Sequence, residues 1–470
     1  MGRLLRELTP FASGFHRLGA ELRHRRLSRE LSQEQLGDLI HHSGALVSKV
    51  EKAERRPGLE FCRLADEALG TDGVLTRLWH AAAPPPDAAT PPPKTAPAVD
   101  DIAEASLRWA EDVSDAVEVI CRMWRSEMDR RTLLASSAWA STAFITPLHA
   151  WLADKPDVLA GRAGRLIGQA EVDTLWTMSV SFADADNQLG GGYARPTLIH
   201  YLDTVVRPLL VHGDYTERIG REALAATARL CDVCGGMSFD SADHGSAQRY
   251  YIQALRLAHA SGNRALAAKI LSDMAKQAQH LGNADQALQL ATAGYDAGLR
   301  GGSPTTAARC AAMQGRAHAL RGDSAAAARS RLLAEKTLDV EASETEPVWI
   351  RFFTPVELTN EAMYMAADLG QYREVRHVAP IIMKNSDGMQ RRRMRSTATL
   401  AHGYLSGKDT DVDHACELLT SILPGLPSMR SASVHNRVND VRRGLIPYRD
   451  RPSVRHVESL YEHTLTTAAV

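Results

Sequence analysis

The sequence predicts an all-α protein in which a small N-terminal helical module precedes a longer α-solenoid. Alanine is abundant among the 470 residues and aromatic residues make up only 6%, which favours closely packed helices over sheets. Apolar residues recur at the three- and four-residue spacing of amphipathic helices in most segments. In the second half of the chain, glycine-containing turns return about every forty residues, as they do in helical repeats.

The composition is that of a chain able to bury a large hydrophobic core. At 470 residues we expect two or three domains, and 44% hydrophobic with 24% charged residues is a typical globular balance. The formal net charge is −1, which excludes a polyelectrolyte that coats nucleic acid or membrane. Any basic surface must therefore be local.

The six cysteines are scattered along a chain whose first residues lack the apolar run of a signal peptide. This favours reduced thiols and a cytoplasmic location. Cys231 and Cys234 form a single C-x-x-C pair, whereas a zinc ribbon needs two such pairs. We expect both to be buried apolar side chains, with redox or metal chemistry as the alternative, and we expect no metal and no cofactor.

Changes in composition divide the chain into five segments. Residues 1–80 form the N-terminal module. Residues 81–101, AAAPPPDAATPPPKTAPAVDD, form a linker, because proline removes hydrogen-bond donors and favours extended backbone. We expect connecting helices over residues 102–168, a repeat array over 169–423 and capping helices over 424–470.

One segment resembles a twin-arginine export signal. Arg130 and Arg131 precede an uncharged run that ends at Ala153, but such signals act at the N-terminus, and Pro147 and His149 interrupt this run. We expect a buried helix and no membrane association, with a membrane tether or an unusual processing site as alternatives.

The N-terminal module consists of short helices with recognisable caps. Ser32 can cap a helix in which Gln35 completes a capping box, and Ser43 can cap the next helix. Two short helices joined by three or four residues make a helix-turn-helix. The apolar positions expected to face inward are Phe15, Leu18, Leu22, Leu27, Leu36, Leu39, Ile40, Leu46, Val47 and Val50.

Residues 32–51 follow the pattern S-Q-x-x-L-x-x-x-x-x-x-S-x-x-x-[VI]-S-x-[VI]-E. Over residues 15–78 the module resembles the phage-repressor (XRE, Cro/cI-like) family. The matching positions are Gln33, Leu36, Ser43, Val47, Val50, Glu51 and Pro57. The resemblance implies that Gln33 contacts a phosphate of operator DNA. It also implies that the helix beginning at Ser43 lies in the major groove.

The expected DNA-contacting residues are Gln33, Ser43, Gly44, Ala45, Ser48, Lys49, Lys52 and Arg55. Lys49 can donate to guanine, and Ala45 can touch a thymine methyl group. The family often has long polar residues where this chain has Gly44 and Ala45, so DNA shape can contribute to recognition. Residues 1–60 hold eleven arginines and lysines against eight acidic residues, a local basic excess. A solvated helical module without a DNA role is the alternative.

A single module of this kind buries only about 600–1,000 Å² on DNA. Dimers that read two half-sites are the usual solution, so we expect the rest of the chain to form a homodimer.

The repeat is marked by glycines expected in tight turns before helices, namely Gly245, Gly282, Gly322, Gly370 and Gly407. Each follows an Ala-rich amphipathic segment, which resembles the helix pairs of tetratricopeptide (TPR) repeats. Small residues at Ala275, Ala287, Gly315 and Ala327 would let paired helices approach closely. A generic α-bundle is the alternative.

A TPR array curls so that the first helix of each pair lines a concave groove. The groove residues expected to bind a ligand are Lys276, Gln279, Arg309, Arg316, Asn360 and Tyr364, with Asp232, Phe239, Ser272 and Glu357 also facing it. Amides and cations along a groove suit a peptide backbone and its termini. The alternative is a merely solvated face.

The combination resembles peptide-sensing regulators of Gram-positive bacteria, and the Ala/Arg-rich composition resembles their actinobacterial counterparts. The resemblance implies a dimeric, DNA-binding transcription regulator whose array binds a signal peptide or small molecule. The alternative is an array that serves only as a protein-interaction scaffold. We find no phosphate loop, G-x-S-x-G or H-E-x-x-H motif in the sequence, so we assign no catalytic residues and expect no enzyme.

Overall fold

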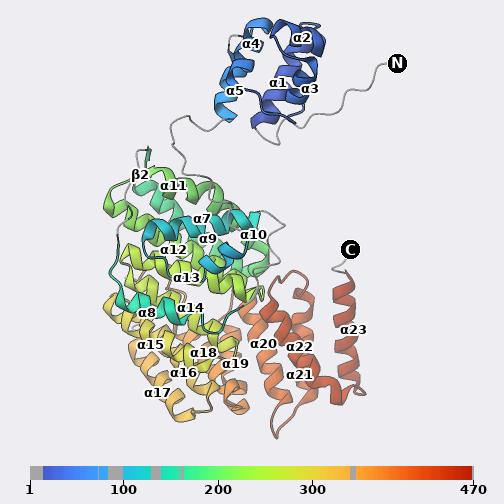
Figure 1. The fold of residues 1–470 in the computed structure, drawn as a ribbon. Coiled ribbons are helices and arrows are strands. Elements are labelled where there is room, and N and C mark those ends of the chain that lie inside the picture. The colour runs from blue at the N-terminus through green and yellow to red at the C-terminus, as the bar shows by residue number, and fades with distance from the viewer. Residues whose placement is uncertain are drawn as a thin grey trace. The chain divides into compact units, whose positions relative to one another are not determined.

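The computed structural model describes residues 14–71, 73–82, 99–128, 139–157, 159, 164–338 and 346–467 (Figure 1). The chain divides into two compact units, Met1–Ala96 and Pro97–Val470, and each is described by itself. Most of the expected linker lies outside the described residues, and so does the Arg130-Arg131 pair of the export-like segment.

Both units are helical, which confirms the prediction of an all-α fold with a helical repeat-like region after the N-terminal module. Among the described residues, the only strands are β1 (Arg165–Leu166) and β2 (Gly213–Asp214), which pair in parallel. These two-residue strands tie neighbouring loops together and form no layer of their own.

The described part of the N-terminal unit consists of α1 (Gly14–Ser28), α2 (Gln33–Leu39), α3 (Gly44–Glu51), α4 (Leu59–Leu69) and α5 (Val74–Ala82). Leu18, Leu22, Leu36, Val47 and Val50 are buried together in its core, as predicted. Their helical spacing therefore gave the correct inward faces of α1, α2 and α3.

Two leucines expected in this core lie on the surface. Leu27 and Leu39 are 47% and 55% exposed. In α2, Leu36 and Ile40 fill the inward face, and Leu39 falls beside it because the helix turns about 100° per residue. In α1, the inward place next to Leu27 is taken by the side chain of Arg26, whose burial is explained below.

The second unit contains the following helices: α6 (Val99–Ala105), α7 (Val113–Met128), α8 (Ile145–Ala153), α9 (Gln169–Leu189), α10 (Gly191–Tyr201), η1 (Leu202–Val206), α11 (Arg207–His212), α12 (Glu217–Asp240), α13 (His244–Ser261), α14 (Arg264–His280), α15 (Ala284–Arg300), α16 (Pro304–Leu320), α17 (Ser324–Thr337), α18 (Pro355–Asp368), α19 (Tyr372–Lys384), α20 (Gln390–Leu405), α21 (Val412–Ile422), η3 (Leu423–Gly425), α22 (Ala432–Leu445), η4 (Ile446–Tyr448) and α23 (Pro452–Thr467). We refer to α9–α22 as the array. Ile120 and Trp124 of α7 are fully buried in the core that α12–α16 share, so this helix packs as part of the same body.

The central helices of the array are joined by one recurrent turn. The caps of α13 to α17 are Asp243, Asn263, Asn283, Ser303 and Asp323, one at every twentieth position, and each accepts a backbone N–H of the first turn. The residue before each cap has a positive φ, at Ala242, Gly262, Gly282, Gly302 and Gly322. The repeating unit of this region is therefore a helix pair with a period of forty residues.

One glycine predicted to lie in a turn does not. Gly245 is the second residue of α13, and Ala242 (φ 63°) has the left-handed conformation at that turn. The other predicted turn glycines do have positive φ values, from 68° at Gly370 to 92° at Gly407. The small residues expected between paired helices are buried, as at Ala275 and Ala287.

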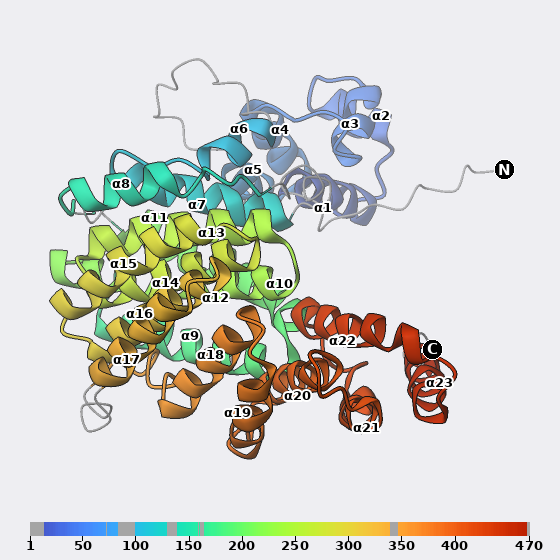
Figure 2. The same cartoon turned by 90° about the horizontal axis from the view of Figure 1, so that it is seen from below.

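The array bends so that its first and last helices meet. Figure 2 shows α20 and α22 beside the green segment of α9 and α10. The backbone N–H of Gly192 donates to the carbonyl of Arg430 (3.1 Å), and the N–H of Arg430 donates to the carbonyl of Leu189 (2.9 Å). These contacts join the two ends of the curved array, and side chains from many of its helices point into the enclosed interior.

Candidate functional site

The helix-turn-helix is built from α2, α3 and the turn between them. The Ser32 hydroxyl accepts from the backbone N–H of Gln35 (3.0 Å), and Gln35 Oε1 accepts from the N–H of Ser32 (2.8 Å), so the predicted capping box is present. Ser43 caps α3 by accepting from the N–H of Leu46 (3.3 Å). His41 makes the turn with a φ of 57°. Local caps therefore set where α3 begins.

The outer face of α3 carries most of the expected DNA-contacting residues. Ser43, Ala45, Lys49, Lys52 and Arg55 are exposed. Among the described residues, no carboxylate lies within ion-pair distance of Lys49, Lys52 or Arg55. These three cations are therefore available to an anionic partner such as the DNA backbone.

A buried ionic network holds α3 against α1 and α2. Arg26 Nε and Nη2 donate to the two carboxylate oxygens of Glu51 at 2.6 and 3.1 Å, and both side chains are at most 4% exposed. Gln33 Nε2 donates to Glu51 Oε2 (2.7 Å), and Arg26 Nη1 donates to the carbonyl of Leu31 (2.6 Å). Gln33 is thus anchored to α3, and its amide nitrogen has a second N–H that can donate to another partner.

Gly44 and Ser48, expected on the same face, are half-buried. A Cβ added at Gly44 would lie 2.9 Å from the Cα of Glu34 in α2. The two helices approach so closely here that a side chain at position 44 has no room. The close approach explains why a long side chain is not accommodated at this position.

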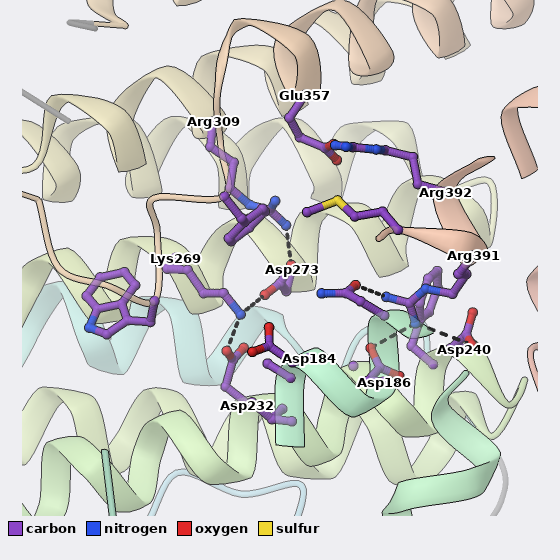
Figure 3. Close-up of a pocket in the computed structure, with 18 of the residues that line it drawn as sticks. Asp184, Asp186, Asp232, Asp240, Lys269, Asp273, Arg309, Glu357, Arg391 and Arg392 are labelled. Atoms are coloured by element: carbon purple, nitrogen blue, oxygen red, sulfur yellow. Dashed lines mark hydrogen bonds and ion pairs between the residues drawn. The ribbon is translucent and has the colours of Figure 1, made fainter. Parts of the chain in front are cut away.

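The array encloses a cavity of about 250 Å³ with walls from α9, α12, α14, α16, α18, α20 and α22 (Figure 3). The charged residues of its walls are Asp184, Asp186, Asp232, Asp240, Asp273, Glu357, Arg229, Lys269, Arg309, Arg391, Arg392 and Arg395, and its apolar residues include Trp349, Phe352 and Tyr364. Acids and bases are balanced in number, which suits a ligand with polar groups of both signs more than an apolar one.

One end of the cavity is fixed by a chain of ion pairs. Lys269 lies between Asp232 and Asp273, and Arg309 contacts Asp273 from the next pair of helices. Burial acts to raise the pKa of Asp273, but Lys269 and Arg309 outweigh it and hold that pKa below its usual range. Burial raises the pKa of Asp232, against the attraction of Lys269. These ion pairs link α12, α14 and α16 at this end of the cavity.

The opposite end is fixed by Arg391 of α20. Its Nη1 lies 2.8 Å from Asp186 of α9 and 3.4 Å from Asp240 of α12, and its Nη2 donates to Asn187 (2.9 Å). Burial acts to raise the pKa of Asp240, but Arg391 and the hydroxyl of Ser431 bring it below its usual value. Burial raises the pKa of Asp186 despite Arg391.

The structure brings three of the six expected ligand-binding residues to the cavity wall, namely Arg309, Asn360 and Tyr364. Gln279 is not part of this wall, because its amide is buried and donates to the carbonyl of Met313 (2.6 Å). Lys276 and Arg316 lie next to the wall without lining it.

Lys276 and Arg316 nevertheless belong to the same charged interior. The guanidinium of Arg316 lies 5.1 Å from the ring centre of Tyr364 and 3.3 Å from Glu361. Burial lowers the pKa of Lys276 to about 8.

Sequence reasoning did not find the residues that close the cavity, Asp186, Asp240, Arg391 and Arg395. They come from helices far apart in the chain, and no local pattern marks them. Lys269 and Asp273 could have been found, since they precede Lys276 by seven and three residues on α14 and so share its face.

All six cysteines are buried. Cys231 and Cys234 are fully buried in the array core, as predicted, and burial raises the pKa of Cys234 to about 12. Within the described ranges, no group of His, Cys, Asp or Glu side chains could hold a metal ion. None of the helices in these ranges is long and apolar enough to cross a membrane.

Comparison with known proteins agrees with the geometry of the N-terminal unit. Residues 17–79 match the profile of a family described as a helix-turn-helix domain. This match supports a DNA-binding regulator. No match was found among curated proteins or among solved structures.

Proposed function

We propose that the protein is a homodimeric, sequence-specific regulator of transcription, located in the cytoplasm, whose TPR-like array senses a signal peptide or small molecule. The observation that carries the DNA-binding part is the outer face of α3. Lys49 of α3 and, just after the helix, Lys52 and Arg55 are exposed and have no acidic partner among the described residues. The buried Arg26–Glu51 pair holds this helix in place.

Phosphate contacts position such a helix, and base-edge contacts give it specificity. Lys49 in the middle of α3 is the candidate for reading a base, with Ser48 and Ala45 beside it. Lys52 and Arg55 follow the helix, and Gln33 begins α2, where contacts to phosphates orient the module on the duplex.

The homodimer follows from the size of the module. A single helix-turn-helix has a small interface with DNA, and two copies on adjacent half-sites combine their binding free energies. The second unit, with its large buried core, is the part we assign to dimerisation.

The array's cavity supports a sensing role. It has room for a small polar ligand or part of a peptide, and Asn360 can both donate and accept, which matches a peptide unit. If the array can adopt two curvatures, a ligand that binds one of them more tightly increases the fraction of molecules with that curvature. The size of the shift is set by the difference between its two affinities. We propose that this changes how the two modules of the dimer reach their half-sites.

Crosslinking the protein to its own genome, followed by gel-shift assays with the recovered fragments, tests this function. We expect Lys49→Ala with Lys52→Ala to weaken operator binding at least about tenfold, because each lost phosphate or base contact costs about 1 kcal/mol or more. Lys408→Ala, which removes an exposed charge from the second unit, is the matched control.

The DNA-binding part is rejected if the full-length protein binds no genomic fragment, or if the double variant binds as tightly as the control. The sensing part is tested separately by adding peptide and metabolite libraries to the gel shift. If these have no effect and a protein co-purifies with the array instead, the array is an interaction scaffold.

A further inference from the structure

Three cations from distant helices lie within electrostatic reach of one another beside the cavity, and one of them stacks on Tyr364. We call Lys276 of α14, Arg395 of α20 and Arg437 of α22 the inner cation cluster. The Arg395 guanidinium carbon lies 4.6 Å from the centre of the Tyr364 ring. Lys276 interacts electrostatically with Arg395, and Arg395 with Arg437, so like charges are neighbours here.

The carboxylates near this cluster are engaged elsewhere. Glu361 and Asp368 both pair with Arg316, at 3.3 and 3.5 Å. Asp440 pairs with Arg443 on the outside of α22 and lies 3.7 Å from Arg437, a long contact. Glu361 attracts Lys276 electrostatically, but it forms no ion pair with Lys276 and is paired with Arg316, so the neighbouring acids compensate the inner cation cluster only in part.

Two members of the cluster have no partner among the described residues. Lys276 and Arg395 form no hydrogen bond and no ion pair there, although both are only partly exposed. A partly buried charge with no carboxylate in direct contact is costly, and such charges are often found where a ligand or a reaction uses them. Arg395 itself lines the cavity, so an incoming group can reach it.

From this placement we infer that the inner cation cluster binds a compact oxyanionic group, a carboxylate or a phosphate, of the ligand that the array senses. The planar guanidinium of Arg395 donates two N–H groups to two oxygens of the anion, and the positive charge of Lys276 attracts the anion from beside the wall. The Tyr364 ring contacts the Arg395 guanidinium and holds it in place. This inference rests on the sensing role proposed above and specifies its ligand chemistry.

The amine of Lys276 is a direct reporter of this site. Burial lowers its pKa to about 8, with Arg395 and Arg309 acting in the same direction. A bound anion stabilises the ammonium form and raises this pKa. Because only the neutral amine reacts with acetic anhydride, a bound anion slows acetylation of Lys276, and each unit of pKa is a factor of about ten in rate near pH 7.

The test is trace acetylation of the full-length protein at pH 7, with peptide mass spectrometry of Lys276 and of exposed Lys408 as the internal reference. The probes are citrate and inorganic pyrophosphate, compared with sodium chloride at equal ionic strength and with the neutral trimethyl ester of citrate. We expect one or both anions to slow acetylation of Lys276 about tenfold, and the ester to have no effect. Protection by citrate alone assigns a carboxylate ligand, and protection by pyrophosphate alone a phosphate ligand.

Arg395→Gln and, independently, Arg437→Gln should reduce this protection. Arg373→Gln should retain it, because Arg373 is 85% exposed and pairs with Asp409 on the outside of the array. The inference is overturned if neither anion protects Lys276 beyond sodium chloride, or if protection survives unchanged in both cluster variants. Protection without any effect on operator binding would keep the site and reject the sensing role, so the two failures are distinguishable.

Discussion

The Nη1 atom of Arg391 lies 2.8 Å from Oδ2 of Asp186, although the two residues belong to helices near opposite ends of the array (Figure 3). A second carboxylate, that of Asp240, lies 3.4 Å from the same nitrogen. One arginine therefore pairs with two buried acids and joins α20 to α9 and α12. This clamp holds the curve of the array closed around its cavity.

Arg391→Gln should destabilise the second unit strongly, by about 3–5 kcal/mol, because it leaves Asp186 and Asp240 buried without a counter-charge. Urea unfolding followed by circular dichroism measures the loss. Adding Asp186→Asn to the variant should recover part of the stability, since one uncompensated charge is then removed. An exposed pair gives the control: Arg373→Gln should cost at most about 1 kcal/mol. Equal losses in the two single variants would contradict the clamp.

Glu51→Leu should loosen α3 on its module, because it leaves the Arg26 guanidinium buried and unpaired and frees Gln33. If the free energy of local opening of α3 falls by about 3 kcal/mol, its backbone amides should exchange roughly a hundredfold faster. Hydrogen–deuterium exchange of peptides covering residues 44–51 in the full-length chain measures it.

The matched control for Glu51→Leu is Glu21→Leu, which removes the partly exposed partner of Arg25. We expect little change in the exchange of α3 in this variant. Unchanged exchange in Glu51→Leu itself would show that the buried network does not fix the helix.

Gly44→Gln tests why this module lacks a long polar residue at the start of α3. The new side chain would meet the backbone of Glu34 at 2.9 Å, so α2 and α3 must separate at a cost of about 1–3 kcal/mol. We expect a lower melting temperature of the N-terminal unit and weaker operator binding, despite the added hydrogen-bonding group. Ala45→Gln, on the exposed face next to it, should leave stability unchanged. Tighter DNA binding by Gly44→Gln would contradict the close approach.

The parts of the fold that the sequence predicts are those with local causes. The capping box of Ser32 and Gln35 and the cap at Ser43 lie within four residues of the groups that they bind, so spacing alone located them. The twenty-residue spacing of the caps was not predicted, because only alternate turns were recognised. Gly262 and Gly302 were overlooked, and Gly245 was assigned to the turn in which Ala242 has the left-handed conformation.

The cavity shows the limit of the same reasoning. The sequence predicted three cavity residues, Arg309, Asn360 and Tyr364, because each lies on the side of its own helix that faces the cavity. Arg391 and Asp186 were not predicted, since their contact depends on the angle accumulated over every helix between them. A small change in the packing angle of each helix pair adds up along the array and would move α20 away from α9. No local residue pattern predicts this accumulated angle.

The last prediction concerns acid sensitivity of the array. The ring of His280 lies 5.2 Å from that of Phe239 and 5.3 Å from that of His244, between centroids. Part of His280 is open to solvent, but its ring packs among other rings, and this burial lowers its pKa from 6.5 to about 4, with His244 and Arg395 acting in the same direction. The unfolded chain therefore binds more protons than the folded one between these two values, so stability falls as the pH drops from 6.5 toward 4.

Carbon-13 labelling of the histidine rings and NMR titration measure this pKa directly. We expect the His280 resonance, assigned from His280→Gln, to stay in its neutral position at pH 5.5, where the same residue in the urea-unfolded chain is protonated. His280→Gln should also flatten the loss of stability between pH 6.5 and 4, because its side chain does not titrate. A folded-state pKa at or above that of the unfolded chain would mean that the ring gains a carboxylate partner or solvent, and the acid sensitivity would then have to arise elsewhere in the array.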